Sequence, residues 1–230
     1  MFIIILIIFM IISFGVSATL RNKFKKYSKI GIKSGLSGNE VAELMLRDHG
    51  IHDVRVTSVK GSLTDHYNPA NKTVNLSEEV YYGRSAAAVA VAAHECGHAV
   101  QHATGYRALE MRSALVPIQN VSGRILNFVV LASIFGGAFL FSTFPFEWVL
   151  LIIIGCYLVL TLFSFITLPV EFNASNRALS WVSDRNIVDA SEHSMAKDAL
   201  KWAAMTYVVA AIGALVSLLY YLSIFLGSRD

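Results

Sequence analysis

Two histidines and a glutamate near the middle of the chain have the spacing of a metal site. The run AAHECGHAV contains the pattern H-E-x-x-H, formed by His94, Glu95 and His98. Its alanine-rich surroundings predict a helix over residues 85–102, with Ser85 as the N-cap. Side chains four residues apart lie on one face of a helix, so His94 and His98 can both bind one metal ion. Glu95 then projects beside the ion, where a general base for a metal-activated water has to be.

The same run has a plainer interpretation, in which the histidines are only packed or solvated. The apolar flank at residues 86–91 predicts a buried helix, which is also where a metal site of this kind is normally built. Gly97 lowers helix propensity by about 1 kcal/mol relative to alanine, so we expect a close neighbour or a functional reason at this position.

The composition indicates a membrane protein. Of the 230 residues, 55% are apolar and only 15% are charged, which is too apolar for an ordinary soluble domain. Two cysteines, Cys96 and Cys156, make no disulfide framework and give no sign of an oxidising compartment. The net charge of +3 is modest. Since no basic patch is interleaved with aromatic residues, we expect no nucleic-acid partner.

Four apolar runs are long enough to cross a bilayer. They are residues 1–20, 125–144, 148–169 and 205–226. No Lys or Arg precedes the first run and five basic residues follow it directly, which predicts a retained anchor with its N-terminus outside; a cleaved signal peptide is the alternative. Four spans place eighteen of the nineteen Lys and Arg residues on one side and only Arg229 on the other. By the positive-inside rule, the side with the eighteen is the cytoplasm.

The segment at residues 37–106 is expected to form a small α+β unit. Ser37 and Glu40 fit a capping box, and apolar residues at helical spacing follow as far as Gly50. The expected strands are residues 53–56, 63–67 and 72–76. The second and third strands flank a turn and predict a hairpin, whose edge strand could hold an extended peptide.

A catalytic zinc ion needs three protein ligands and an open position for water, so a third ligand must come from elsewhere in the chain. His102 lies one turn beyond His98, too far along a straight helix for three imidazoles to close around one ion, and we expect it to be packed or to support the site. Glu171 is the better candidate, because two spans separate it from His98 and an even number of crossings returns the chain to the same side. The alternative for Glu171 is an ordinary carboxylate at the end of a membrane helix.

Two segments together resemble the membrane-embedded gluzincin proteases of the HtpX and Ste24 kind. They are HECGH at residues 94–98 and EFNAS at residues 171–175. The chain is still more similar to the YugP-like family of bacterial membrane neutral zinc metallopeptidases. That similarity includes LTDHY at residues 63–67, VAAHE at 91–95, QHATGY at 101–106 and LPVEF at 168–172. It covers most of residues 37–207 and weakens around residues 181–198.

The resemblance implies that His94, His98 and Glu171 bind one zinc ion per chain and that Glu95 is the catalytic base. One position departs from the pattern. HtpX-like proteases have an Asp four residues after the glutamate ligand, where it supports a metal-binding histidine. Ser175 stands there in this chain, so the supporting carboxylate is missing.

We therefore expect a mainly α-helical membrane protein with four transmembrane helices and a small α+β zincin-like catalytic unit on the cytoplasmic side. Its expected parts are the four spans at 1–20, 125–144, 148–169 and 205–226, a cytoplasmic catalytic region at 21–124, and a cytoplasmic segment with the third metal ligand at 170–204. The expected function is zinc-dependent hydrolysis of peptide bonds in peptides or membrane proteins at the cytoplasmic surface of the bilayer. Two imidazoles and a carboxylate with an open position favour zinc over other divalent metals.

Other functions fit parts of this pattern. A membrane zinc-binding or chaperone-like protein would bind the metal without turnover, and a zinc hydrolase could attack a bond other than a peptide bond. A channel or transporter would be expected to have ionisable residues within its spans, and the apolar runs contain essentially none. The residues to test for stabilising the oxyanion, each with a structural or solvated role as the alternative, are His66, Tyr106, Arg177 and His193.

Overall fold

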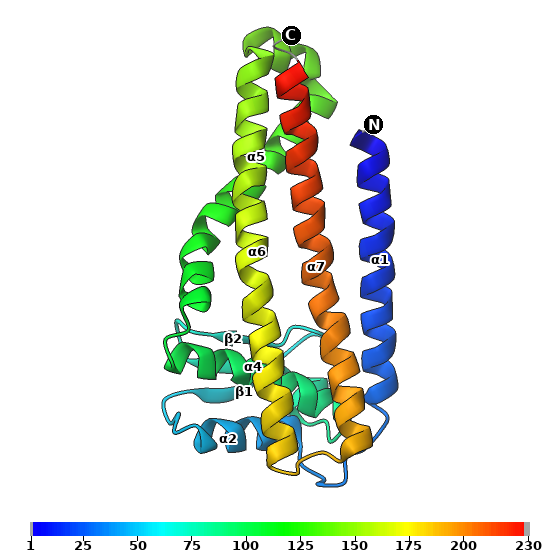
Figure 1. The fold of residues 1–230 in the computed structure, drawn as a ribbon, viewed down its shortest axis with the longest axis vertical. Coiled ribbons are helices and arrows are strands. Elements are labelled where there is room, and N and C mark those ends of the chain that lie inside the picture. The colour runs from blue at the N-terminus through cyan, green and yellow to red at the C-terminus, as the bar shows by residue number, and fades with distance from the viewer. Residues whose placement is uncertain (1, 228–230) are drawn as a thin grey trace. The chain divides into compact units, whose positions relative to one another are not determined.

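The computed structural model describes residues 2–227, apart from the side chains of residues 2, 3, 6 and 137–142. Arg229 lies outside the described residues. Within them the chain is mainly helical, with a small sheet (Figure 1). The elements are α1 (Phe2–Tyr27), α2 (Gly38–Asp48), β1 (Arg55–Val59), β2 (His66–Asn68), β3 (Thr73–Ser77), α3 (Glu78–Tyr81), α4 (Ala86–Ala103), α5 (Arg107–Thr143), α6 (Phe146–Asp184) and α7 (Ala190–Gly227).

Four of the described helices are long and apolar enough to cross a membrane, in agreement with the four predicted spans. The apolar stretches are Ile7–Tyr27, Arg107–Gly136, Phe146–Asp184 and Ala190–Gly227. The helices are longer than the predicted spans. In particular, α5 begins well before residue 125, and α6 continues beyond Pro169. A hydropathy window marks only the apolar part of a helix, whereas backbone hydrogen bonding continues into polar sequence.

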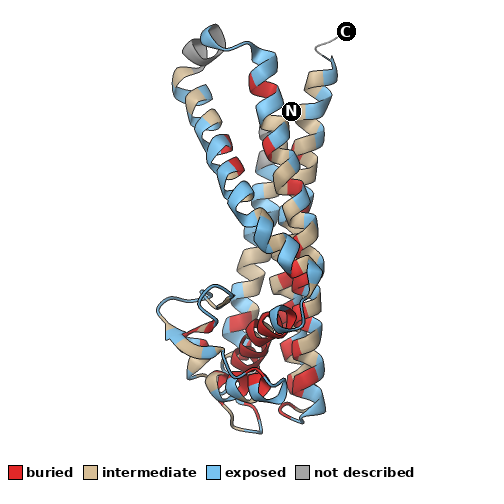
Figure 2. Cartoon of the chain, turned by 90° about the vertical axis from the view of Figure 1, so that its left-hand side faces the viewer, coloured by how far each residue is buried: buried red, intermediate tan, exposed pale blue. Residues whose placement is uncertain are grey.

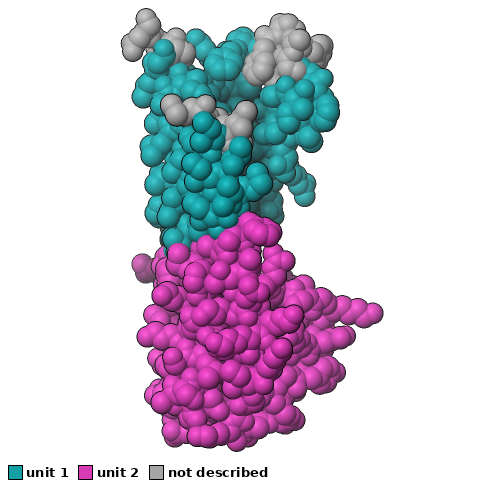
Figure 3. All heavy atoms as spheres, turned by 90° about the vertical axis from the view of Figure 1, so that its right-hand side faces the viewer, with its two compact units in different colours: residues 1–13, 111–168, 207–230 teal, residues 14–110, 169–206 magenta. Residues whose placement is uncertain are grey.

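The chain forms two compact units, each made of segments distant in sequence (Figure 3). The first unit consists of residues 1–13, 111–168 and 207–230, and the second of residues 14–110 and 169–206. His94, His98 and Glu171 all belong to the second unit. The candidate site therefore lies within this unit alone.

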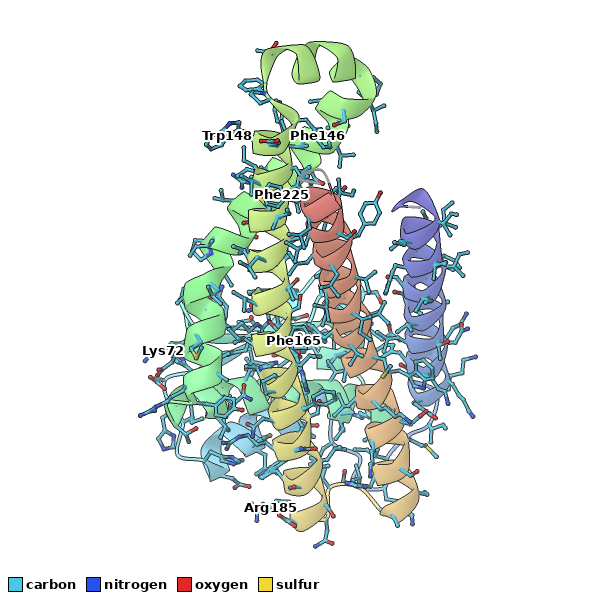
Figure 4. All side chains as sticks on the ribbon, turned by 45° about the horizontal axis from the view of Figure 1, so that its top comes forward. Lys72, Phe146, Trp148, Phe165, Arg185 and Phe225 are labelled. Carbon is cyan, nitrogen blue, oxygen red and sulfur yellow. The ribbon has the colours of Figure 1, made fainter. Side chains whose placement is uncertain are left out.

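The first unit exposes large apolar side chains, as a protein surface in contact with lipid does. Ile134 and Phe135 are 68% and 84% exposed. Phe146 and Trp148 stand at the beginning of α6, and Figure 4 shows Phe165 further along the same helix. An apolar surface of this extent, with an aromatic residue at the end of a span, suits a bilayer and its interface.

The sheet of the second unit has the order β1-β3-β2, so β3 is the central strand and β2 lies at one edge. β2 and β3 pair antiparallel, which confirms the predicted hairpin, with Tyr67 opposite Val74. β1 pairs parallel with β3, and it begins at Arg55, two residues later than the strand predicted at residues 53–56. Val74 and Leu76 of β3 are fully buried, so one face of the sheet covers the core.

The helices of the second unit pack against this sheet. Ser37 forms the predicted capping box with Glu40 at the start of α2, and Ser85 caps α4 by accepting a hydrogen bond from the backbone of Ala88. Most residues of α4 are buried, and Figure 2 shows how the buried positions gather inside this unit. The Sγ atom of Cys96 lies 3.6 Å from the backbone oxygen of Ala42 on α2. Because burial raises the pKa of Cys96, its thiol stays protonated and serves packing.

Candidate metal centre

Three side chains from two helices converge on one point in the second unit. Their possible ligand atoms, from His94, His98 and Glu171, all lie within 4.8 Å of one another. Oε2 of Glu171 is 3.3 Å from Nε2 of His94 and 3.7 Å from Nε2 of His98. Glu171 is only 2% exposed and His98 is 7% exposed. The structure thus brings together the three residues that the sequence analysis selected.

The two histidines are placed by the helical repeat of α4. They stand one turn apart with ring centroids separated by 4.8 Å and ring planes at 84°, so both Nε2 atoms can face the same point. The N-cap at Ser85 fixes where this helix begins, and the alanine-rich sequence keeps it close to its neighbours.

Gly97 allows α6 to approach α4 at the height of the site. A Cβ atom at this position would lie 2.6 Å from the backbone oxygen of Ala174, closer than real contacts allow, and 3.1 Å from its Cα atom, which is tighter than most contacts. The close neighbour expected at Gly97 is therefore the backbone of α6. Since Glu171 is on the same helix as Ala174, this contact brings the carboxylate within reach of both histidines.

The ring nitrogen of His98 that faces away from Glu171 contacts a buried glutamine. The Oε1 atom of Gln101 lies 3.0 Å from Nδ1 of His98, and Gln101 is completely buried. A hydrogen bond at Nδ1 leaves Nε2, the atom that faces Glu171, to bind a metal. Gln101 was given no role from the sequence, although it stands three residues after His98 on the same helix and begins the family-like stretch at residues 101–106.

His94 has a corresponding partner in Ser175. The hydroxyl oxygen of Ser175 lies 3.1 Å from Nδ1 of His94, and Ser175 is buried. The residue at the position that departs from the HtpX-like pattern therefore still contacts a histidine of the site. A neutral hydroxyl replaces the carboxylate as the acceptor, so the support is weaker but present.

Glu95 lies beside the three converging residues and is held by the edge strand. The backbone N–H of Tyr67 in β2 donates a 2.9 Å hydrogen bond to Oε2 of Glu95, whose exposure is 8%. Since Tyr67 belongs to the predicted hairpin, the sheet edge fixes this carboxylate next to the site. The helical spacing predicted Glu95 beside the metal, whereas its backbone partner depends on tertiary contacts that the sequence does not show.

The charges of the site favour a cation. Burial alone would lower the pKa of His98, but hydrogen bonding to Glu171, the negative charges of Glu95 and Glu171 and the bond to Gln101 together raise it. The electrostatic field therefore attracts positive charge at the point where the ligand atoms meet. Two imidazole nitrogens and one buried carboxylate also form a donor set that suits zinc, so the residues present fit the expected ion.

Asp65, just before β2, adds a further negative charge near Glu95. Its Oδ1 atom accepts hydrogen bonds from the backbone N (2.7 Å) and Oγ (3.0 Å) of Ser77. Burial raises the pKa of Asp65, and the charge of Glu95 adds to the rise, which outweighs the opposing effect of the bonds from Ser77. Asp65 thereby ties the beginning of β2 to the end of β3.

The other residues considered from sequence lie elsewhere or have other contacts. Nδ1 of His102 is 2.7 Å from the hydroxyl of Tyr67, and His102 does not belong to the ligand cluster. His66 is exposed and bonds to the backbone oxygen of Thr64, while Nε of Arg177 donates to the side chain of Asn173. Nothing in the described contacts gives Tyr106 or His193 a place in the cluster. A role of any of these residues in stabilising the oxyanion stays a prediction.

Four membrane-type helices and a buried site of two histidines and a carboxylate define a membrane protein with a candidate metal centre. Comparison with known proteins gives the family. The chain belongs to the family described as "Putative neutral zinc metallopeptidase", which matches residues 2–226. It is 40% identical over 223 residues to the "Putative membrane protease YugP" of Bacillus subtilis (strain 168), covering 95% of this chain and 94% of that protein. No solved structure matches the chain significantly.

Proposed function

We propose that this protein is a membrane-embedded, zinc-dependent endopeptidase that binds one zinc ion through His94, His98 and Glu171 and uses Glu95 as its general base. The observation that carries the proposal is the convergence of the three ligand atoms within 4.8 Å, with Glu95 held beside them. Membership of a zinc metallopeptidase family and the similarity to a membrane protease support it.

The chemistry divides between the metal and the protein. A zinc ion, when bound, would acidify a water molecule and polarise the scissile carbonyl. Glu95 accepts the proton of the attacking water and then delivers it to the leaving amine, so the same carboxylate acts first as base and then as acid. The hydrogen bond from Tyr67 keeps Glu95 oriented during both transfers.

The site's position next to a sheet edge supports a peptide as the substrate. β2 is an edge strand, and its Tyr67 contacts Glu95 directly. An extended peptide lying along such an edge would present its backbone carbonyl groups near the base, because added strands align their peptide groups with those of the edge. Peptides and extended segments of membrane proteins are the substrates that this geometry favours.

We further propose that the catalytic region at residues 21–124 and the segment at residues 170–204 both face the cytoplasm. The basic residues that follow the first span and the absence of basic residues between the second and third spans support this orientation. The N-terminus would then be outside, and the ligands from α4 and α6 would share the cytoplasmic side of the bilayer.

Zinc content and cleavage of unfolded casein, measured on detergent-purified protein, test the proposal. The wild type should hold about one zinc ion and cleave, Glu95→Gln should hold zinc without cleaving, and Glu171→Ala should lose zinc. Glu95→Gln is a matched variant because the amide oxygen can still accept the hydrogen bond from Tyr67. If Glu171→Ala kept both zinc and activity, the third ligand would be wrongly assigned.

Two outcomes would favour the alternative functions. Zinc binding without cleavage of casein or of a panel of shorter peptides would support a non-catalytic zinc-binding or chaperone-like protein. Hydrolysis of ester or formyl-amide substrates, with no hydrolysis of peptides, would support a zinc hydrolase acting on another bond.

A further inference from the structure

Gln101 makes three hydrogen bonds that link the two helices of the site. Its Oε1 atom is 3.0 Å from Nδ1 of His98, and its Nε2 atom is 2.8 Å from the backbone oxygen of Val170 and 3.0 Å from Oδ1 of Asn173. The side chain is fully buried, so water does not compete for these bonds. Val170 directly precedes Glu171, so a single amide connects the backbone next to one candidate ligand with the ring of another.

The partners of the amide determine which way it faces. A backbone carbonyl can only accept a hydrogen bond, so the NH₂ group of Gln101 must point at Val170. The contact with Asn173 supports the same orientation of the Gln101 amide. The guanidinium of Arg177 can only donate, and its Nε lies 2.8 Å from the side chain of Asn173, so the atom of Asn173 that it faces is the acceptor Oδ1. The atom of Gln101 that contacts this oxygen must then be the NH₂ nitrogen. The oxygen of Gln101 therefore faces His98.

The direction of the amide in turn determines the tautomer of His98. An amide oxygen accepts only, so Nδ1 of the neutral imidazole must carry the proton. Nε2 then has its lone pair free, and this atom faces Glu171 at 3.7 Å. The carbonyl of Val170 thus fixes the amide of Gln101, and this amide fixes the proton of His98 on Nδ1, which leaves Nε2 able to bind a metal.

We propose that Gln101 is the positioning residue of the site: it sets His98 in the metal-binding tautomer and holds α4 and α6 at the spacing that the ligands need, before any metal binds. The inference rests on the proposed zinc site, and it is independent of whether the protein cleaves peptides. Ser175 on α6 gives His94 on α4 a similar partner. Among the described contacts, however, the Ser175 hydroxyl has no second hydrogen bond that would fix its direction.

Two variants separate positioning from simple packing. Gln101→Leu keeps the approximate volume and removes every hydrogen bond. Gln101→Glu keeps an oxygen that accepts from Nδ1 of His98 and removes the NH₂ group that donates to Val170 and Asn173. Asn176→Leu, an exposed substitution on α6, serves as the control. Zinc affinity is measured for each full-length protein in detergent by competition with a chromophoric chelator, alongside thermal unfolding of the metal-free protein.

We expect Gln101→Leu to weaken zinc binding by about 10- to 100-fold and Asn176→Leu to stay within about threefold of the wild type. Gln101→Glu should fall between them, because it keeps the acceptor for His98 but loses the donor to Val170 and Asn173. A folded Gln101→Leu variant with wild-type affinity would overturn the proposal. So would a folded Gln101→Glu variant that binds as weakly as Gln101→Leu, because the acceptor that faces His98 would then contribute nothing to zinc binding.

A spectrum of the wild type tests whether His98 has the expected tautomer, even if both Gln101 variants fail to fold. Nitrogen-15 spectra of histidine-labelled, metal-free protein, recorded at a pH at which the imidazoles are neutral, report the tautomer of each ring. We expect His98, identified by the signal that disappears in His98→Gln, to be protonated on Nδ1, and protonation on Nε2 would overturn the proposal. If the wild type bound no zinc, the proposed function would fail. The tautomer of His98 in the metal-free protein would still test the role of Gln101, because that measurement does not depend on zinc.

Discussion

The hydroxyl of Ser175 lies 3.1 Å from Nδ1 of His94, on the side of the ring that faces away from Glu171. A proton on Nδ1 of His94 can be donated to this oxygen, which leaves Nε2 free to bind a metal. Both histidines of the site therefore have a hydrogen-bond partner at Nδ1, one from an amide and one from a hydroxyl. This pairing is what a metal-binding histidine normally requires of its surroundings.

The first prediction concerns the strength of this support. Ser175→Ala removes the acceptor and should lower zinc affinity by roughly 10-fold, the lower end of the range for such partners. Ser175→Asp supplies a charged acceptor and should bind zinc at least as tightly as the wild type. Chelator competition measures both, and an alanine variant with unchanged affinity would show that the contact does not support His94.

The second prediction concerns the close approach of α4 and α6. Gly97→Ala would place a Cβ atom 2.6 Å from the backbone oxygen of Ala174, so the helices would have to move apart. We expect a loss of about 1–3 kcal/mol in the free energy of unfolding and weaker zinc binding, because the shift separates Glu171 from the histidines.

Gly123→Ala on α5 is the matched control, since nothing lies within 4 Å of a Cβ atom there. It should leave the thermal unfolding of the detergent-solubilised protein unchanged or slightly improved. Equal effects of the two substitutions would mean that the contact with Ala174 is not tight in solution.

Local signals were sufficient to predict several parts of this fold and site. Capping at Ser37 and Ser85, the hairpin and the histidine spacing depend on residues close in sequence, and the structure shows all of them. The approach at Gly97 was also expected, because a glycine inside a helix needs a reason. Each of these predictions used a physical rule that operates within a few residues.

The parts that were not predicted depend on contacts between distant segments. The helix that carries Glu171 continues to Asp184 because Ala178 and Val182 are buried in the core of the second unit, and a hydropathy pattern cannot show this. The parallel pairing of β1 with β3 and the role of Gln101 likewise depend on where another element lies. Composition and periodicity carry no information about such partners.

The third prediction tests the alternative third ligand. His102→Ala should keep about one zinc ion per chain, because Nδ1 of His102 bonds to the hydroxyl of Tyr67 and the residue lies outside the ligand cluster. The lost hydrogen bond should lower the free energy of unfolding by about 1 kcal/mol. Metal analysis of His102→Ala beside Glu171→Ala decides which of the two residues is the third ligand. Loss of zinc only from His102→Ala would assign that role to His102.

The fourth prediction is a dependence of stability on pH. Burial raises the pKa of Asp65 in the folded protein, so this group contributes stability that is fully present below the pKa of the unfolded chain and is lost as the pH rises through the folded pKa. Asp65→Asn cannot titrate and can still accept the bond from the backbone of Ser77. Its stability relative to the wild type should therefore increase from about pH 4 to neutral pH.

Unfolding of the metal-free proteins across this pH range measures the difference between wild type and Asp65→Asn. Metal-free protein is used so that zinc binding does not add its own pH dependence. A difference that stays constant with pH would show that Asp65 has the same pKa in the folded and unfolded states.

The fifth prediction concerns the side of the membrane on which each part of the site lies. Single cysteines introduced at the exposed positions Ser62, Glu147 and Asn176 can be labelled in intact cells with a maleimide that does not cross membranes. The native Cys96 and Cys156 are buried, and the unsubstituted protein gives their background. We expect Glu147→Cys to react from outside, and Ser62→Cys and Asn176→Cys to react only after permeabilisation.

The comparison of positions 62 and 176 tests the site as well as the orientation. In the proposed topology two crossings separate the regions that contain these residues, so both must lie on the same side if His98 and Glu171 bind one ion. Labelling of both from outside, with Glu147→Cys protected, would reverse the orientation and leave the site possible. Labelling of only one of the two would place the histidines and the carboxylate on opposite sides of the bilayer, and Glu171 could then not be the third ligand.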